Sequence, residues 1–325
     1  MTFTVVVTDY DFADLELERD LVTEAGGRLV AAQSETPRDV AEAAAGAGAD
    51  GLLVQYAPVT TAVFEALDDL VVVGRYGVGV DTVDVEAATA HGVQVVNVPS
   101  YCEDEVSTHA FALLLTCVRK TSQYDTAVAD GEWDWTAARP IRRLTGQTLG
   151  LAGFGSIPRR VADKADAFGL DVVAYDPYVD RETVAEHGAE KVTFGELLAR
   201  ADAVSIHVPL TDETERLFDA AAFERMREHA VVVNTARGAV VDVDDLLAAL
   251  EAGEVAGAGL DVLPEEPPEP SALLTRDDVV TTPHVAWYSE ESYEELRRSA
   301  TRDVIRAIRG EQPDGLVNDE RLDGG

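Results

Sequence analysis

The charge balance of this 325-residue chain excludes several classes of partner. It carries 61 acidic against 26 basic residues, a formal net charge of −35, and such a surface repels nucleic acids and anionic membranes. Its two cysteines, Cys102 and Cys117, are too few for a disulfide framework and lack metal-ligand spacing, so we expect no metal site. The chain begins without a signal-peptide pattern and has no apolar run long enough to span a membrane, which predicts a cytoplasmic protein.

The acidic excess has two interpretations. It could serve solubility alone, or it could be a halophilic adaptation to a salt-rich cytoplasm. In the second case, screening over about 3 Å at 1 M salt makes the self-repulsion tolerable. Lysine occurs only at Lys120, Lys164 and Lys191, and the other basic residues are arginines. Of the two interpretations, we favour the halophilic adaptation.

Short β-branched runs alternate with helical patterns over the first hundred residues. Helices are predicted around residues 14–25 and 60–67 and in "VDVEAATAHG". Strands are predicted in "TVVVTD", "GLLVQY", "LVVVGRYG" and "VQVVNVP". Strands separated by helices indicate a parallel α/β sheet.

A long helical pattern then interrupts the alternation. Residues 100–133 are predicted as one helix with a broad apolar stripe, opened by Ser100 or by Glu103–Glu105. After a loop with Trp133 and Trp135, a second α/β series follows. Its strands are predicted in "TLGLAGFG", "DVVAYDP", "AVSIHVP", "AVVVNTARG", "VAGAGLDV" and "VVTTPHVA". The final stretch, "SEESYEELRRSATRDVIRAIRG", predicts a helix followed by a loose polar tail.

The segment "GFGSIPRR" is typical of a dinucleotide-binding turn, with Pro158 where the third glycine is usual. Backbone amides at the start of the following helix can hold a pyrophosphate. With Ser156 as N-cap, Pro158 falls in the first turn, where a proline forfeits no helical hydrogen bond. The missing glycine could still move the helix away from the strand. Alternatively, the segment is an ordinary β–α–β unit.

Asp176 ends the next predicted strand, at about the 20-residue offset expected of a carboxylate that binds the adenosine ribose. A carboxylate there would repel the 2′-phosphate of NADP, so NAD is the expected cofactor. In the alternative interpretation, Asp176 only caps a turn.

Three polar residues follow the later strands. Arg237, Glu266 and His284 lie in loops at the carboxyl ends of parallel strands, where open α/β sheets place their sites. An arginine can bind a carboxylate bidentately and polarise a carbonyl, and a histidine can exchange a proton near neutral pH. A carboxylate beside the histidine can fix its tautomer and keep it protonated. With a nicotinamide as hydride carrier, this set predicts interconversion of 2-oxo and 2-hydroxy acids.

Each of these residues also has a structural alternative. Arg237 could form an ion pair at a helix cap, Glu266 could be a solvated loop acid, and His284 could be a polar cap after proline. Other histidines in helical patterns, such as His91, His187 and His229, are expected at the surface.

The segments "NTARG", "LDV…EEPP" and "TPHVAWYSEES" resemble the signature segments of the D-2-hydroxyacid dehydrogenases. The resemblance covers essentially the whole chain. "TDYDF", "YGVGVD" and "PSYC" are most similar to the branch with C-terminal binding proteins and phosphoglycerate-dehydrogenase-like enzymes.

The resemblance implies a role for each matching residue. Arg237 would bind the substrate, with His284 as acid/base and Glu266 as its partner. The residues implied to contact NAD are Thr108, Gly153, Gly155, Ser156, Ile157, Asp176, His207, Pro209, Thr214, Thr235, Ala236 and Asp261, the last near the nicotinamide amide. The residues implied on the substrate side are Arg75, Tyr76, Val78, Gly79 and Trp287, with Val78 and Gly79 offering backbone amides to the substrate carboxylate.

The resemblance also implies the architecture. We expect two doubly wound parallel-sheet domains, with a Rossmann-type NAD domain (100–285) inserted in a flavodoxin-like substrate domain (1–99 plus 286–325). The long helix after residue 100 would help to form a homodimer. No regulatory extension is expected, and Glu266 argues against formate as substrate, because formate dehydrogenases of this fold carry an amide there. The alternative function is an NADH-sensing, protein-binding module like the C-terminal binding proteins.

The acidic surface predicts that salt stabilises the protein. Between dilute buffer and molar KCl, we expect the thermal unfolding midpoint to rise by roughly 4–8 °C, or about 2 kcal/mol for domains of this size. Scanning calorimetry across a KCl series measures this rise. A midpoint that does not move would leave solubility as the role of the acidic excess.

Overall fold

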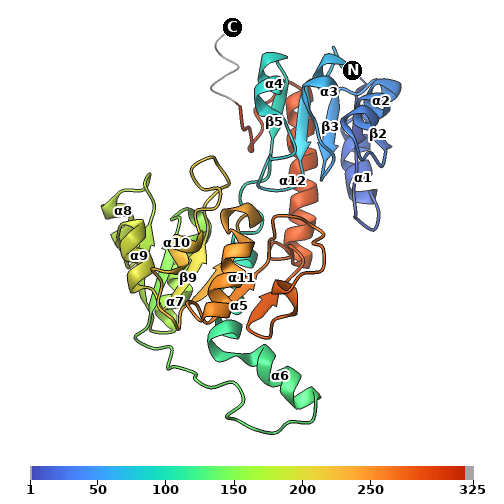
Figure 1. Cartoon of the computed structure of the whole chain (residues 1–325). Helices are drawn as coiled ribbons and strands as arrows, with labels where there is room; N and C mark the ends of the chain where they lie inside the picture. The colour runs from blue at the N-terminus through green and yellow to red at the C-terminus, as the bar shows by residue number, and fades with distance from the viewer. Residues whose placement is uncertain (1, 319–325) are drawn as a thin grey trace. The chain divides into compact units, whose positions relative to one another are not determined.

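The computed structural model describes residues 2–318, which divide into two compact units (Figure 1). Within the described residues, unit 1 comprises residues 2–101 and 289–318, and unit 2 comprises Cys102–Tyr288. The sequence prediction placed the divisions after residues 99 and 285. None of the helices in residues 2–318 has the length and apolar run needed to cross a bilayer.

Unit 1 is built on a five-stranded parallel sheet in the order β2-β1-β3-β4-β5, as in flavodoxin-like folds. Its strands are β1 (Thr4–Val7), β2 (Arg28–Ala31), β3 (Gly51–Val54), β4 (Val72–Arg75) and β5 (Gln94–Val96). Its helices are α1 (Glu16–Glu24), α2 (Pro37–Ala47), α3 (Thr61–Glu65), α4 (Val85–Ala90) and α12 (Glu290–Ile308).

Helix α12 returns the chain to unit 1 and lies directly on its sheet. A β-carbon at Gly74 would stand 2.4 Å from Val304, and one at Gly51 would stand 2.9 Å from the same side chain. Glycine at these two positions therefore lets the helix approach the strands. A buried ion pair also joins α12 to α1, since Arg297 donates to both carboxylate oxygens of Glu18 at 2.8 and 2.7 Å.

The segment after α12 is not the loose tail that we predicted. Leu316 forms an antiparallel bridge with Val96, and the Asn318 side chain accepts from the Val95 amide at 3.0 Å. Residues up to 318 are therefore held along β5 by backbone pairing, which their polar composition does not indicate. The rest of the predicted tail lies outside the described residues.

Unit 2 is built on a seven-stranded parallel sheet in the order β12-β11-β10-β9-β6-β7-β8. Its strands are β6 (Thr148–Ala152), β7 (Asp171–Tyr175), β8 (Ala189–Lys191), β9 (Ala203–Ile206), β10 (Val231–Asn234), β11 (Gly257–Leu260) and β12 (Val279–Thr281). Its helices are α5 (Glu103–Arg119), α6 (Thr121–Ala129), α7 (Ser156–Ala167), α8 (Arg181–Glu186), α9 (Phe194–Arg200), α10 (Ala220–Phe223), α11 (Val243–Ala252) and the short 3₁₀ turns Gly238–Val240 and Leu273–Thr275.

Helices cover both faces of this sheet. Val231 and Val233 belong to a core that includes residues of α5 and α7, whereas Val232 belongs to a second core with residues of α9 and α11. Because successive strand residues point to opposite faces, the two cores lie on opposite sides of the sheet. The predicted doubly wound α/β fold is confirmed.

The predicted single helix over residues 100–133 is wrong. Lys120 adopts a left-handed conformation (φ 52°) that ends α5, and α6 begins at Thr121. Helix α5 starts at Glu103 and has Cys102, without a side-chain cap, before it. Helix α6 has no buried residue, so the buried face of α5 does not continue past Lys120.

Candidate active site

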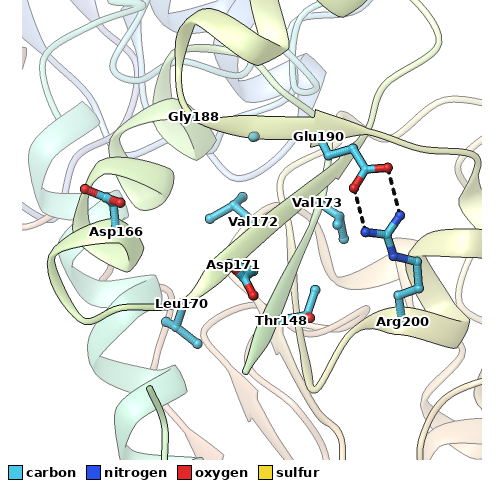
Figure 2. Close-up of a pocket in the computed structure, with 10 residues that line it drawn as sticks. Thr148, Asp166, Leu170, Asp171, Val172, Val173, Gly188, Glu190 and Arg200 are labelled. Carbon is cyan, nitrogen blue, oxygen red and sulfur yellow. Dashed lines mark hydrogen bonds and ion pairs between the residues drawn. The ribbon is translucent and has the colours of Figure 1, made fainter. Parts of the chain in front are cut away.

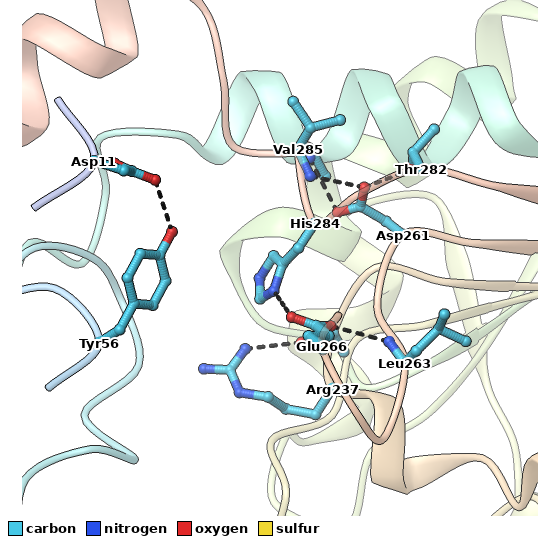
Figure 3. A network of polar contacts seen from close by, with 11 residues as sticks. Asp11, Tyr56, Arg237, Asp261, Leu263, Glu266, Thr282, His284 and Val285 are labelled. Atoms are coloured by element: carbon cyan, nitrogen blue, oxygen red, sulfur yellow. Dashed lines mark hydrogen bonds and ion pairs between the residues drawn. The ribbon is translucent and has the colours of Figure 1, made fainter. Parts of the chain in front are cut away.

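The carboxyl ends of β10, β11 and β12 carry the three expected polar residues. The strands pair in register, with Asn234 opposite Leu260 and Leu260 opposite Thr281. The loops that follow therefore leave the sheet at the same edge. Arg237, Glu266 and His284 come from these three loops and lie together in Figure 3.

His284 and Glu266 form a direct hydrogen bond. The distance from His284 Nδ1 to Glu266 Oε2 is 2.7 Å, and Glu266 Oε1 accepts from the Leu263 amide at 3.0 Å (Figure 3). Partial burial raises the pKa of Glu266, but the hydrogen bonds from His284 and Leu263 and the charge of Arg237 outweigh it and lower the pKa overall. The carboxylate is therefore ionised at neutral pH. Glu266 accepts a hydrogen bond from Nδ1 of His284, so Nε2 is the ring nitrogen that can exchange a proton with a ligand.

His284 is held in an unusual backbone conformation. Its φ of 51° lies in the left-handed region, which costs a non-glycine residue on the order of 1–3 kcal/mol. Its backbone amide donates to the Asp261 carbonyl at 2.8 Å. The side chain of Asp261, only 2% exposed, accepts from the Thr282 hydroxyl and from the amides of Val285 and Ala286, at 2.6, 2.9 and 3.0 Å. This carboxylate fixes the backbone on both sides of His284.

Sequence reasoning missed His109, on α5. Its Nε2 lies 3.0 Å from Thr282 Oγ1 and 3.5 Å from Asp261 Oδ1. Because the Thr282 hydroxyl donates to Asp261, its oxygen accepts from His109. No motif marks this histidine, which lies far before Asp261 in the chain and meets it only through the packing of α5 on the sheet.

Arg237 lies beside the pair because two loops approach closely. A β-carbon at Gly238 would stand 2.0 Å from the carbonyl carbon of Leu263, so only glycine lets the loop after β10 contact the loop that carries Glu266. The buried Asn234 amide donates to the Arg237 carbonyl at 2.9 Å and accepts from the Ala236 amide at 3.0 Å. Arg237 Nη1 donates to the Ala236 carbonyl at 2.8 Å.

The dinucleotide turn is formed as expected, with one correction. Gly155, not Ser156, is the N-cap of α7. Pro158 is buried in the first turn, where its missing amide has no helical acceptor to lose. Gly153 has a φ of 96°, and a β-carbon there would stand 2.7 Å from the carbonyl oxygen of His207. Gly155 and Ser156 are exposed, so the start of α7 can receive a ligand.

Asp176 has a structural role of its own. Its carboxylate accepts from the Phe154 amide at 2.8 Å and from the amides of Tyr178 and Val179 at 2.8 and 3.1 Å. A carboxylate offers about four acceptor positions, so the turn-capping interpretation holds while one position stays available for a ribose hydroxyl.

Most of the remaining residues expected along the cofactor follow β9 and β10, at the same edge of the sheet. The Thr214 hydroxyl donates to the Pro209 carbonyl at 2.5 Å and orders that loop. His207 bonds to Ser205 Oγ at 2.8 Å, and burial lowers its pKa to about 3, so it is neutral. Thr235 Oγ1 is buried and has no hydrogen-bond partner within residues 2–318. Thr108 is exposed on α5, and Ile157 is half-buried.

The residues expected on the substrate side divide between the units. In unit 1, the loop after β4 presents Val78, whose carbonyl accepts from Asn97 at 2.6 Å, and Gly79 follows it. Tyr76, expected to shape a pocket, is buried with its ring edge-on to Phe12. It supports the loop from within the core. In unit 2, the half-buried Trp287 packs edge-on to Tyr288.

A separate hollow of about 520 Å³ lies at the amino ends of β6 and β7, beside the ion pair of Glu190 and Arg200 (Figure 2). It contains none of the expected site residues. Among the described residues, no three histidine, cysteine or acidic side chains are grouped as a metal site.

Comparison with known proteins identifies the family. Residues 111–286 match the model of the D-isomer specific 2-hydroxyacid dehydrogenase NAD binding domain. The chain is 39% identical over 261 residues to D-3-phosphoglycerate dehydrogenase of Methanocaldococcus jannaschii, covering 80% of this chain and 50% of that one. It is 39% identical over 268 residues to glyoxylate reductase of Korarchaeum cryptofilum, covering 81% and 80%. The chain thus spans about half the length of the phosphoglycerate dehydrogenases that it matches.

Solved structures show the same fold over the whole chain. The TT0316 protein of Thermus thermophilus superposes with a TM-score of 0.86 at 31% identity, covering 98% of this chain and 100% of that one. D-lactate dehydrogenase of Aquifex aeolicus, solved with NAD and lactic acid, superposes with a TM-score of 0.84 at 27% identity, covering 99% and 98%. The chain belongs to the D-isomer-specific 2-hydroxyacid dehydrogenase family, and its unit 2 contains the family's NAD-binding domain.

Proposed function

We propose that this protein interconverts a 2-oxo acid and a D-2-hydroxy acid with NAD(H). The observation that carries this proposal is the 2.7 Å hydrogen bond between His284 and an ionised Glu266, beside Arg237, at the carboxyl edge of an NAD-binding sheet. Glyoxylate reductase and D-lactate dehydrogenase, two relatives, are named for reactions of this class.

Each side chain has a defined task in the proposed reduction. The Arg237 guanidinium binds the substrate carboxylate and polarises the adjacent carbonyl. His284 donates the proton on Nε2 to the carbonyl oxygen, while Glu266 keeps the imidazole in the donating form through Nδ1. When bound, NADH supplies the hydride that carbon 2 receives. In the oxidation direction His284 accepts the proton again.

The carboxyl edge of the unit 2 sheet carries groups that can bind the pyrophosphate and ribose of a dinucleotide. Gly155 and Ser156 leave the start of α7 open for a pyrophosphate, and Asp176 keeps one acceptor position for a ribose hydroxyl. The buried Thr235 hydroxyl, which has no partner among the described residues, can bond to a polar group of the cofactor. We also propose that unit 1 is the substrate domain, with backbone amides of Val78 and Gly79 at the substrate carboxylate.

We further propose that the protein is a homodimer that works in a salt-rich cytoplasm. Helix α6 and the segment after it lie apart from the layers of unit 2 (Figure 1) and expose Val128, Trp133 and Trp135, the two tryptophans at 91% and 74%. Large exposed apolar side chains gathered on one segment favour burial against a second subunit.

Replacing the proton donor should stop turnover and spare cofactor binding. For His284→Ala we expect kcat for 2-oxo acid reduction to fall about 1,000-fold, within the range of general acid catalysis, and the NADH Kd to change less than about 3-fold. Steady-state kinetics and fluorescence titration measure the two quantities. His91→Ala, which changes an exposed histidine of unit 1, is the control.

Loss of NADH binding in His284→Ala would show that its role is misassigned. A wild-type protein that binds NADH tightly and turns over no 2-oxo acid would instead favour a sensing function.

Neutralising Asp176 should relax cofactor choice. Asp176→Asn removes the charge that would repel a 2′-phosphate. Its one oxygen can serve either the Phe154 amide or the amides of Tyr178 and Val179, so NADH kcat/KM is expected to fall as well. We expect the ratio of kcat/KM for NADPH to that for NADH to rise about 10-fold, which corresponds to roughly 1.4 kcal/mol. Asp171→Asn, at the opposite end of β7, is the control. An unchanged ratio would refute the repulsion.

Removing the exposed tryptophans should separate the subunits. For Trp133→Ser with Trp135→Ser, light scattering after size exclusion should give a mass near that of one chain, 34.8 kDa. The wild type and Tyr178→Ser, an exposed aromatic elsewhere on unit 2, should give twice that mass. A variant that stays dimeric would place the interface on another surface.

A further inference from the structure

Three loops at the carboxyl ends of β1, β3 and β4 form one edge of unit 1. They comprise residues 8–11, 55–57 and 75–79. In open parallel sheets, ligands bind at the carboxyl ends of the strands. If unit 1 is the substrate domain, as the proposed function holds, the loop after β4 contacts the substrate carboxylate through Val78 and Gly79. The loops after β1 and β3 then contact the part of the substrate beyond its 2-oxo acid group.

The first two loops are tied together rigidly. The buried Asp9 carboxylate accepts from the backbone amides of Gln55, Tyr56 and Ala57 at 3.1, 2.5 and 3.0 Å. The buried Gln55 side chain accepts from the Asp11 amide at 3.0 Å and donates to Asp11 Oδ1 at 2.6 Å. The position of the Asp11 carboxylate is therefore fixed from two directions.

Asp11 places a negative charge on the surface of this edge. The side chain is exposed, and the Tyr56 hydroxyl points at its second oxygen, at 3.4 Å (Figure 3). Tyr56 itself is 60% exposed and presents an aromatic ring beside the carboxylate. The three loops carry two aspartates and a single basic residue, Arg75.

This arrangement is unsuited to a doubly charged substrate. A phosphate group is bound by several cationic or N–H donors, typically arginines that bind it bidentately. Here the single arginine shares the edge with a fixed carboxylate, which repels a phosphate or a second carboxylate and tolerates a neutral side chain. The exposed ring of Tyr56 adds an apolar surface for such a side chain.

We propose that Asp11 is a specificity-determining residue that restricts the enzyme to 2-oxo acids without a second anionic group. The substrate class is then a monocarboxylic 2-oxo acid with an apolar or hydroxylated side chain. This inference rests on the proposed function.

Matched substrate pairs test the inference. Hydroxypyruvate and phosphohydroxypyruvate differ by one phosphate, and 2-oxopentanoate and 2-oxoglutarate differ by one terminal carboxylate. We expect wild-type kcat/KM with NADH to favour the singly charged acid of each pair by about 100-fold or more. Asp11→Asn keeps an oxygen for Gln55 and should reduce this preference by about 10-fold.

A control variant and a salt series test whether the substrate preference comes from the charge of Asp11 or from the shape of its side chain. Asp68→Asn changes the net charge equally, at an exposed residue before β4, and should leave the preference unchanged. Raising KCl should weaken the wild-type preference, because salt screens repulsion between exposed charges, and should affect Asp11→Asn much less. The wild-type salt series shows whether the preference is electrostatic, and the comparison with Asp11→Asn separates the charge of Asp11 from the net charge of −35 that the rest of the chain contributes to.

The outcomes distinguish this inference from the proposed function. Wild-type preference for the doubly charged acids, or a preference that neither Asp11→Asn nor salt changes, would overturn the inference alone. Turnover of none of the four acids would overturn the proposed function, and the inference with it.

Discussion

The candidate site depends on one buried carboxylate, that of Asp261. A carboxyl group so far from water needs several hydrogen-bond donors to be stable, and the donors here are the Thr282 hydroxyl and the amides of Val285 and Ala286. Satisfying Asp261 therefore fixes the chain on both sides of His284, including its left-handed backbone. The position of His284 opposite Glu266 depends on this ordered segment.

Three places in the described residues share one structural arrangement. An aspartate just after a strand accepts backbone amides from the loop of a neighbouring strand: Asp9 from the loop after β3, Asp176 from the loop after β6 and Asp261 from the loop after β12. Most acidic residues of this chain contribute to its surface charge, whereas these three carboxylates bind backbone amides within the fold. Each orders a loop at the carboxyl edge of a sheet, where the residues proposed to carry function lie.

The sequence predicts the fold class well because the buried strands are β-branched runs and the family segments span the chain. It predicts less well what depends on packing. The short strands β2 and β8 have too few β-branched residues to be predicted as strands. Lys120 ends α5 although the helical pattern of the sequence continues past it. The N-cap of α7 is Gly155, one residue before the predicted cap. Arg237, Glu266 and His284 could be found from their motifs, whereas His109 meets Thr282 only through the tertiary fold. The hydrogen bonds that Asp261 accepts from Thr282, Val285 and Ala286 could not be predicted from the sequence either. The sequence indicated a role for Asp261 only through the family resemblance, which implies a position near the cofactor.

The most direct test of this account is Asp261→Asn. The new amide would place an N–H against one of the backbone donors and loosen the segment around His284, and such misplacement can cost about 100-fold in rate. We predict that kcat for 2-oxo acid reduction falls by about that factor, while the NADH Kd changes less than about 3-fold. Weakened NADH binding with an unchanged kcat would contradict the account and favour the cofactor contact that the family resemblance implies for Asp261.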